Sequence, residues 1–167
     1  SFSLNLIPLL ICIPSSILVA LLMYFLKLPR WFGPADTIFA AHNRAGTLDV
    51  KGGFGSTLAS FISISGGASV GIYGPLVHFG GTISAFIRKF SFVPKIPHDI
   101  IIGSGVAAAI SAGFGAPLAG IIFAHEIVLR HFSMKAITAL AVASMAANFS
   151  ASEINLINSS ISLIFCI

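Results

Sequence analysis

Long uncharged stretches alternate with short charged ones along this chain. Residues 4–26, 52–87 and 100–125 contain no Asp, Glu, Lys or Arg. About 20 apolar residues in a helix cross the ~30 Å hydrocarbon core of a bilayer, so each stretch is long enough to span a membrane. The first stretch contains Pro8 and Pro14, which predict a helix that is kinked or starts late.

The other two uncharged stretches are interrupted by glycine and proline. The interruptions lie near residues 71–75 and at residues 113–117. Each stretch therefore predicts two shorter helices instead of one long one. Residues 136–152 predict a further helix and residues 154–167 the start of another. The pattern as a whole indicates an all-α protein.

The composition makes a membrane the expected environment. Only 8% of the 167 residues are charged and 56% are hydrophobic, with a mean hydropathy of +1.00. Soluble domains carry about 25% charged residues, so there is too little polar surface here to coat a globule. The net charge of +4 is spread thinly, which argues against a nucleic-acid-binding module. We expect an integral, multi-pass protein of the plasma or inner membrane.

The ends of the chain and its loops add two expectations. The chain begins at Ser1 in an apolar run, without an initiator Met or a basic leader, so an internal fragment is expected. Bases occur in every loop between the apolar segments, and the positive-inside rule therefore selects no orientation.

Three prolines follow a small residue at expected helix starts: Gly33-Pro34, Gly74-Pro75 and Ala116-Pro117. Proline suits the first helical position, because it needs no backbone donor there. A helix that starts inside a bilayer leaves unpaired N–H groups, which are tolerated around a protein-lined or watery cavity and attract anions. Channels and transporters use such discontinuous helices. Close helix packing is the alternative role of the glycines, as in the spacing of Gly67 and Gly71, and the two roles are compatible.

Other candidate chemistry is weak, and neither an enzyme nor a metal or cofactor site is expected. Gly67-Ala-Ser69-Val-Gly71 matches the nucleophile elbow of hydrolases, but it lies in an uncharged run without the required strand. No histidine has a carboxylate at zinc-site spacing. His78 and His125 lie inside apolar runs, where packing or a helix-to-helix hydrogen bond is expected. Cys12 and Cys166 are expected to be inert and buried.

Glu126 is the one carboxylate that adjoins a membrane segment on both sides. A buried glutamate needs a partner, and Arg130, four residues on, would lie on the same helix face. Backbone donors are the other possible partners. A structural role is favoured over an ion or proton path.

Two blocks of the chain resemble the CLC family of chloride channels and chloride/proton antiporters. Residues 66–75 read Gly-Gly-Ala-Ser-Val-Gly-Ile-Tyr-Gly-Pro and resemble the stretch ending in G-[KR]-E-G-P. Residues 112–126 resemble the segment A-x-F-x-A-P-[LIV]-[AG]-G-[IV]-L-F-x-x-E. The resemblance covers about residues 30–150. It implies a bundle of short, tilted, discontinuous helices arranged as two inverted repeats, in homodimers with one pore per subunit. Residues 1–167 would form a single fragment, about the first repeat.

The departures from the family pattern bear on mechanism. The family's gating glutamate falls on Tyr73, and the inner proton-transfer glutamate of its antiporters falls on Ile127. A phenol stays protonated near neutral pH and cannot shuttle protons, although it can donate a hydrogen bond. The resemblance therefore implies passive, uncoupled conduction of chloride or another small anion, with Tyr73 as a neutral plug at the gate.

The resemblance also implies an anion site built from backbone groups. The expected ligands are the amides of Ile72, Tyr73 and Gly74, with Gly33 and Pro34 as a second helix start facing the pore. The family's chloride-coordinating serine falls on Trp31 when its proline is aligned on Pro34, so either the inner ligand is absent or the alignment shifts. The residues given structural roles are Pro75, Pro117 and Glu126.

Two alternatives stay open at this point. Gly/Pro-broken helices also occur in other secondary transporters, so a different anion transporter is possible. The missing serine and carboxylates equally fit a degenerate, non-conducting membrane protein.

Overall fold

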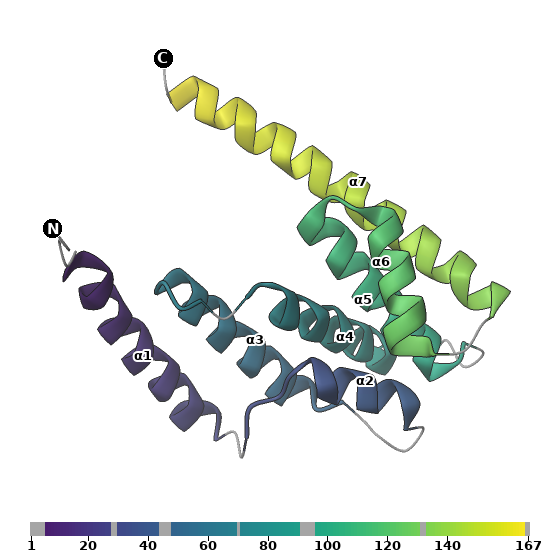
Figure 1. Cartoon of the computed structure of the whole chain (residues 1–167), viewed down its shortest axis with the longest axis horizontal. Coiled ribbons are helices and arrows are strands. Elements are labelled where there is room, and N and C mark those ends of the chain that lie inside the picture. Colours follow the sequence, from purple (N-terminus) through teal and green to yellow (C-terminus); the bar gives the residue numbers. More distant parts are fainter. Residues whose placement is uncertain are drawn as a thin grey trace, which may run out of the picture.

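The chain folds into a bundle of helices in a computed structural model that describes residues 6–27, 30–43, 48–69, 71–90, 96–130 and 133–165. No strand occurs among these residues. The elements, shown in Figure 1, are α1 (Leu6–Leu26), α2 (Pro34–His42), α3 (Val50–Ser65), α4 (Tyr73–Phe90), α5 (His98–Phe114), α6 (Pro117–Phe123), the π-helical turn η1 (Ala124–Leu129) and α7 (Met134–Phe165). The expectation of an all-helical chain is confirmed.

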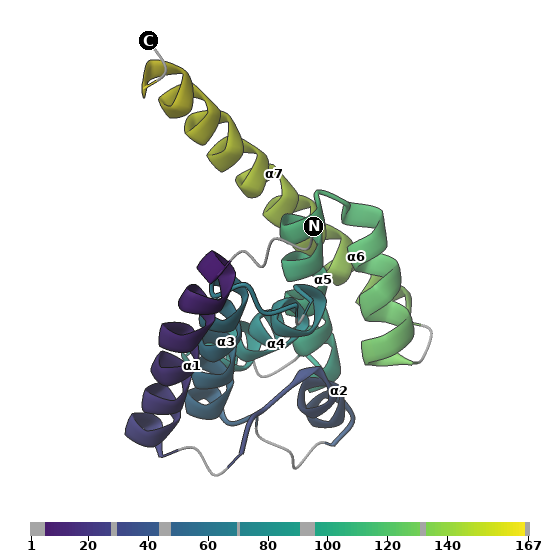
Figure 2. The ribbon, with the colours of Figure 1, turned by 60° about the vertical axis from the view of Figure 1, so that its left-hand side comes forward.

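Helix α5 is the centre of the bundle. It packs against α2, α4, α6, η1 and α7. Its buried residues Ile102, Val106 and Ala107 form the core together with Val77 of α4 and Leu140 of α7. Helix α1 lies at one edge and packs on α3, while α7 extends well beyond the body of the bundle (Figures 1 and 2).

Small residues let α4 and α5 cross closely. A Cβ atom added at Gly80 would meet the carbonyl oxygen of Gly105, and one added at Gly105 would meet the Ser84 hydroxyl. The alternative of close helix packing does not hold at Gly67 and Gly71, because both lie in the link between α3 and α4 with nothing within 4 Å of an added Cβ. Their φ angles of 88° and 71° are ones that glycine adopts readily.

The two predicted helix breaks are confirmed. Helix α3 ends at Ser65 before α4 begins at Tyr73, and α5 ends before α6 begins at Pro117. Gly115 ends α5 with φ 63°, in the left-handed region. Pro117 occupies the first position of α6, as expected. Pro75 does not occupy the first position of α4; it is the third residue, still within the turn whose N–H groups have no intrahelical acceptor.

One prediction about the end of the chain is wrong. Helix α7 is continuous over residues 134–165, where a helix and the start of a second one were expected. Glu153 lies between the two expected segments and is exposed, so its charge does not interrupt the helix. Helix α1 includes both Pro8, in its first turn, and Pro14, and the kink expected from these prolines stays a prediction. Cys166 lies outside the described residues.

Apolar length and outward-facing side chains agree with a membrane environment. Residues 134–155 of α7 are long and apolar enough to cross a membrane, and few of them are buried within the chain. Val142, Met145 and Phe149 on this helix are all more than 60% exposed. Three further helices are apolar but shorter: Cys12–Leu26, His98–Phe114 and Pro117–Leu129.

Candidate functional site

Two of the three expected helix starts come together in space. Helix α2 begins at Pro34 and α4 at Tyr73, and a Cβ atom added at Gly74 would lie 3.8 Å from Cγ of Pro34. Both starts line a small cavity of about 90 Å³ between α2, α3 and α4. The residues that line it are Phe32, Gly33, Pro34, Ser56, Thr57, Ser60, Gly74, Pro75 and His78.

The start of α2 is already capped by a carboxylate. The Gly33 N–H donates to Oδ2 of Asp36 at 2.8 Å, and Oδ1 of Asp36 accepts from Nη2 of Arg30 at 2.7 Å. A carboxylate in this position complements the positive end of the helix dipole. The Gly33 amide is therefore occupied, and Pro34 has no N–H to offer an anion. The start of α2 therefore contributes a wall beside the start of α4 and no free backbone donor at Gly33 or Pro34.

The start of α4 is more open. Its first helical bond runs from the Leu76 N–H to the Ile72 oxygen at 3.2 Å. Helix geometry leaves the N–H groups of Tyr73 and Gly74 without an acceptor inside the helix. Ile72 is 56% and Tyr73 41% exposed, so these two residues at the start of the helix are open to an approaching ligand. Of the two starts, this one has the donors that an anion requires.

The Tyr73 side chain points to the end of α6. Its ring meets the ring of Phe123 edge to face, with centroids 5.0 Å apart and an interplanar angle of 89°. Ile127, four residues after Phe123 on η1, is 38% exposed. Neither Tyr73 nor Ile127 has a charged group, so both positions are neutral at any physiological pH.

The expected pairing of Glu126 with Arg130 is wrong. Both residues are exposed, and no ion pair joins them in the described part of the chain. The reason is local geometry. Residues 124–129 form a π-helical turn, and Arg130 ends it with φ 56°. The spacing of four residues that aligns side chains on an α-helix therefore does not align these two.

His78 forms the helix-to-helix hydrogen bond that its position in an apolar run predicts. Its Nδ1 lies 2.8 Å from the Thr37 hydroxyl of α2, and the His78 side chain is only 2% exposed. Its Nε2 is buried with no hydrogen-bond partner among the described residues. A buried unpaired polar group destabilises a protein by about 1–3 kcal/mol.

The polar residues of α3 that line this cavity could not be identified from the sequence. Ser56 Oγ accepts from the Phe32 N–H at 2.9 Å, just before the start of α2. Ser60 donates to the carbonyl of Ser56. The spacing of Ser56 and Ser60, four residues apart on one helix, was the available signal. Serine and threonine are common in membrane helices, however, so the spacing alone is weak.

The third expected start, at Pro117, lies apart from the other two. The Ser144 hydroxyl donates to the Pro117 carbonyl at 2.8 Å, and the Ser111 hydroxyl donates to the Ser144 carbonyl at 2.7 Å. These bonds join α5, α6 and α7. Pro117 therefore takes part in the packing of these three helices and does not line the cavity at Gly33 and Gly74.

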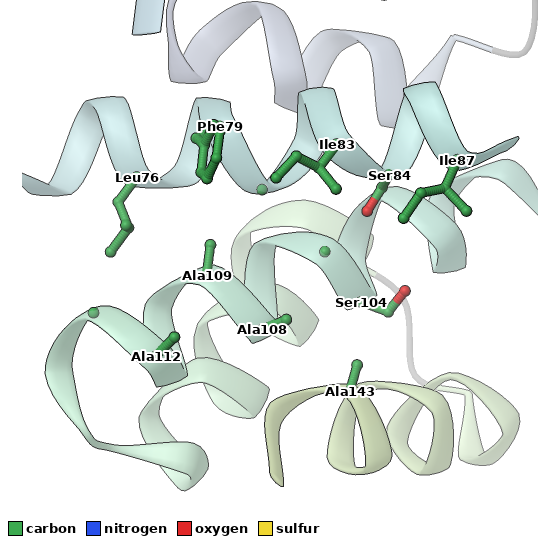
Figure 3. Close-up of a pocket in the computed structure, with 13 residues that line it drawn as sticks. Leu76, Phe79, Ile83, Ser84, Ile87, Ser104, Ala108, Ala109, Ala112 and Ala143 are labelled. Carbon is green, nitrogen blue, oxygen red and sulfur yellow. The ribbon is translucent and has the colours of Figure 1, made fainter. Parts of the chain in front are cut away.

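A larger cavity of about 520 Å³ lies between α4, α5 and α7. Figure 3 shows Leu76, Phe79 and Ile83 of α4 facing Ala109 and Ala112 of α5 across it. Its lining is apolar apart from two serines, so it offers no charged group to an anion. No cluster of three metal-ligating side chains occurs within the described ranges either.

Comparison with known proteins identifies the family. The sequence profile described as "Voltage gated chloride channel" matches residues 15–164. A putative chloride channel protein, ClcB-like, of Ralstonia nicotianae is 28% identical over 132 residues, which cover 76% of this chain and 30% of the relative. No solved structure gives a significant match.

Two human proteins are also similar over shorter stretches. H(+)/Cl(-) exchange transporter 3 is 30% identical over 103 residues, 59% of this chain and 12% of the relative. H(+)/Cl(-) exchange transporter 7 is 35% identical over 78 residues, 39% of this chain and 10% of the relative. The chain thus spans less than a third of the length of these curated relatives. Because the profile covers nearly all of its residues, the chain belongs to the voltage-gated chloride channel family, a family of membrane channels and transporters and not of enzymes.

Proposed function

We propose that the protein containing this chain conducts chloride or another small anion passively across a lipid bilayer, without coupling to protons. The observation that carries this proposal is Tyr73, a neutral, part-exposed side chain at the first residue of α4. The resemblance places a gating glutamate at this position in proton-coupled relatives.

The anion is held by backbone donors at the start of α4. The N–H groups of Tyr73 and Gly74 have no acceptor within the helix, and the preceding Ile72 is exposed beside them. Such donors carry partial charges only, so they bind an anion loosely enough to release it. Pro75, in the same turn, has no N–H group that would need an acceptor, and Gly33 and Pro34 form the neighbouring wall.

The absence of coupling follows from two positions. Proton transfer needs a group that gains and loses a proton near neutral pH. Tyr73 stays protonated there and Ile127 has no titratable group. Neither Tyr73 nor Ile127, the two positions where the resemblance places proton-transferring glutamates, can therefore carry protons. The backbone N–H groups proposed to bind the anion do not depend on these side chains.

The complete pathway requires more chain than these residues. The chain covers 30% of its bacterial relative. We infer that further helices, arranged as a second inverted repeat, close the pathway around the start of α4. The family resemblance also favours a homodimer with one pathway in each subunit.

Chloride flux from liposomes, recorded with an external pH electrode, tests the proposal on the whole protein. We expect chloride efflux when the membrane potential is clamped with a potassium ionophore, and no accompanying movement of protons. Proton uptake driven by chloride at a fixed ratio would overturn the uncoupled mechanism. A complete absence of anion flux would instead indicate a non-conducting protein, and saturable flux of another anion that chloride does not inhibit would indicate a different transporter.

A further inference from the structure

Two apolar cavities adjoin each other along helix α5. The first, of about 520 Å³, lies between α4, α5 and α7. The second, of about 440 Å³, lies between the beginnings of α5 and α7 and includes Ile96, just before α5. Ser104 and Ala143 line both cavities, so the two meet at these residues. Together they form one groove, called here the α5 groove, and no charged side chain lines it.

The length of the first cavity matches one leaflet of a bilayer. Figure 3 shows Leu76 and Ala112 at one end of this cavity and Ile87 and Ser104 at the other. Leu76 and Ile87 are separated by about 17 Å along α4, since an α-helix rises 1.5 Å per residue. Half of the ~30 Å hydrocarbon core is about 15 Å. A lipid acyl chain that extends from the surface to the middle of the bilayer therefore fits this length.

The width of the cavity favours an acyl chain over a protein helix. A volume of about 520 Å³ spread over about 17 Å gives a cross-section of about 30 Å². An α-helix with its side chains is about 10 Å across and needs about 80 Å². A single hydrocarbon chain is much narrower, and apolar walls such as those of Phe79 and Ile83 suit it.

Basic side chains gather at one end of the α5 groove. Arg88 and Lys89 lie in the last turn of α4, directly after Ile87. Nη1 of Arg88 donates to Nδ1 of His98, the first residue of α5, and the other N–H groups of the guanidinium remain for a ligand. Lys135 is the second residue of α7. Arg88, Lys89 and Lys135 are all exposed.

Helix periodicity aligns two of these bases with the groove. Arg88 follows Ser84 by four residues, and Lys135 precedes Ala139 by four, so each lies on the face of its helix that lines the groove. Asp99 is the one carboxylate in the last turn of α4 and the first turns of α5 and α7, which leaves this end positive. Residues 73–87 of α4 and 100–114 of α5 contain no charge. The groove is thus apolar along its length and positive at one end.

We propose that the α5 groove binds an anionic phospholipid, with one acyl chain between α4, α5 and α7 and the phosphate at Arg88 and Lys135. Lysine and arginine at the membrane surface attract anionic headgroups, and the apolar groove begins directly beside them. The lipid would hold α4 and α7 against α5 from the side of the bilayer. The proposal requires only that the chain lies in a membrane, and it does not depend on anion conduction.

Native mass spectrometry of the whole protein in detergent tests the headgroup contacts. Phosphatidylglycerol should bind more tightly than phosphatidylcholine with the same acyl chains. A basic side chain beside an anionic headgroup contributes about fivefold in affinity, so Arg88→Gln with Lys135→Gln should weaken phosphatidylglycerol binding about 25-fold. Lys27→Gln with Lys51→Gln is the matched control, because it removes the same charge from exposed positions outside the groove. Equal binding of the two lipids, or unchanged phosphatidylglycerol binding in the first variant, would overturn the proposal.

Narrowing the groove tests the position of the acyl chain. Ala143→Leu places a larger side chain where the two cavities meet and should reduce the retention of both lipids. Ala146→Leu, at an exposed position of α7 that lines neither cavity, should retain them. A cryo-EM map of the whole protein in phosphatidylglycerol nanodiscs should show chain-like density in the groove, and a protein helix in that place would contradict the proposal. Lipid retention and chloride flux are measured separately, so this proposal and the proposed conduction can fail independently.

Discussion

The rings of Tyr73 and Phe123 meet edge to face with centroids 5.0 Å apart, so the first residue of α4 is held against the last residue of α6. Aromatic pairs of this geometry contribute about 0.5–1.5 kcal/mol beyond the area they bury. The contact fixes the direction of the phenol while 41% of the side chain stays exposed. A ring that is oriented by a neighbour and not covered by it suits the role proposed for Tyr73, a plug at the gate.

Replacing Tyr73 by Ala tests whether the ring obstructs the anion. Tyr73→Ala removes the ring and keeps the backbone N–H groups of the proposed site, so we expect chloride flux in liposomes to rise severalfold. Tyr73→Phe is the matched control, because it keeps the ring and the contact with Phe123. Its flux should stay close to that of the unmodified protein. Equal flux in all three proteins would remove Tyr73 from the gate.

Much of the helix layout could be predicted from the sequence, because local chemistry determines it. Glycine and proline mark the breaks before Tyr73 and before Pro117, and both breaks occur there. The continuity of α7 could not be predicted from the charge of Glu153, since an exposed charge on a long helix meets solvent or lipid headgroups without disturbing the backbone. Whether a charge interrupts a helix depends on what surrounds it.

The site was predicted less completely, because its contacts join distant parts of the chain. The motifs at Gly33 and Gly74 each predicted a helix start, and their convergence on one cavity is a result of folding. Local pattern also gave the wrong partner for Glu126, because the spacing of four residues assumes an α-helix and these residues form a π-helical turn. The carboxylate of Asp36, three residues after Gly33, was not expected to occupy the amide of this start.

The hydrogen bond between Thr37 and His78 makes α2 and α4 one unit. Both side chains are buried, so Thr37→Val leaves Nδ1 of His78 without its hydrogen-bond partner. We expect a loss of about 1–3 kcal/mol in the free energy of unfolding, measured by denaturation in detergent. Thr138→Val is the control. The Thr138 hydroxyl bonds to the Lys135 carbonyl at the exposed start of α7, and its removal should change stability by less than about 0.5 kcal/mol. Equal losses in the two variants would contradict the buried pairing.

The close crossing of α4 and α5 should not tolerate a methyl group at Gly105. An added Cβ would overlap the Ser84 hydroxyl and the Gly80 carbonyl, and backbone cannot move aside easily. We expect Gly105→Ala to lower the free energy of unfolding by about 1–3 kcal/mol. Gly33→Ala is the matched control, because Gly33 has φ −142° and nothing within 4 Å of an added Cβ. A Gly105→Ala protein as stable as this control would show that the helices cross at a greater distance.

Asp36 is the negative charge that competes with an anion at the start of α2. Its carboxylate holds the Gly33 N–H at 2.8 Å, in the place where an anion would otherwise bind. Asp36→Ala exposes this amide, removes the negative charge at the start of α2 and leaves Arg30 without its ion-pair partner. We therefore expect two effects in the same protein: a loss of about 0.5–2 kcal/mol in stability from the missing cap, and a severalfold rise in chloride flux.

Asp49→Ala separates these two effects. Asp49 caps α3 by accepting from the Lys51 N–H at 3.2 Å, and it does not line the cavity at Gly33 and Gly74. Its removal should lower stability by a similar amount and leave flux unchanged, because the cap is lost without any change of charge at the anion site. If Asp49→Ala raised flux as much as Asp36→Ala, loosening of the bundle would explain both results. A rise confined to Asp36→Ala would mean that the carboxylate at the start of α2 repels the anion that approaches the start of α4.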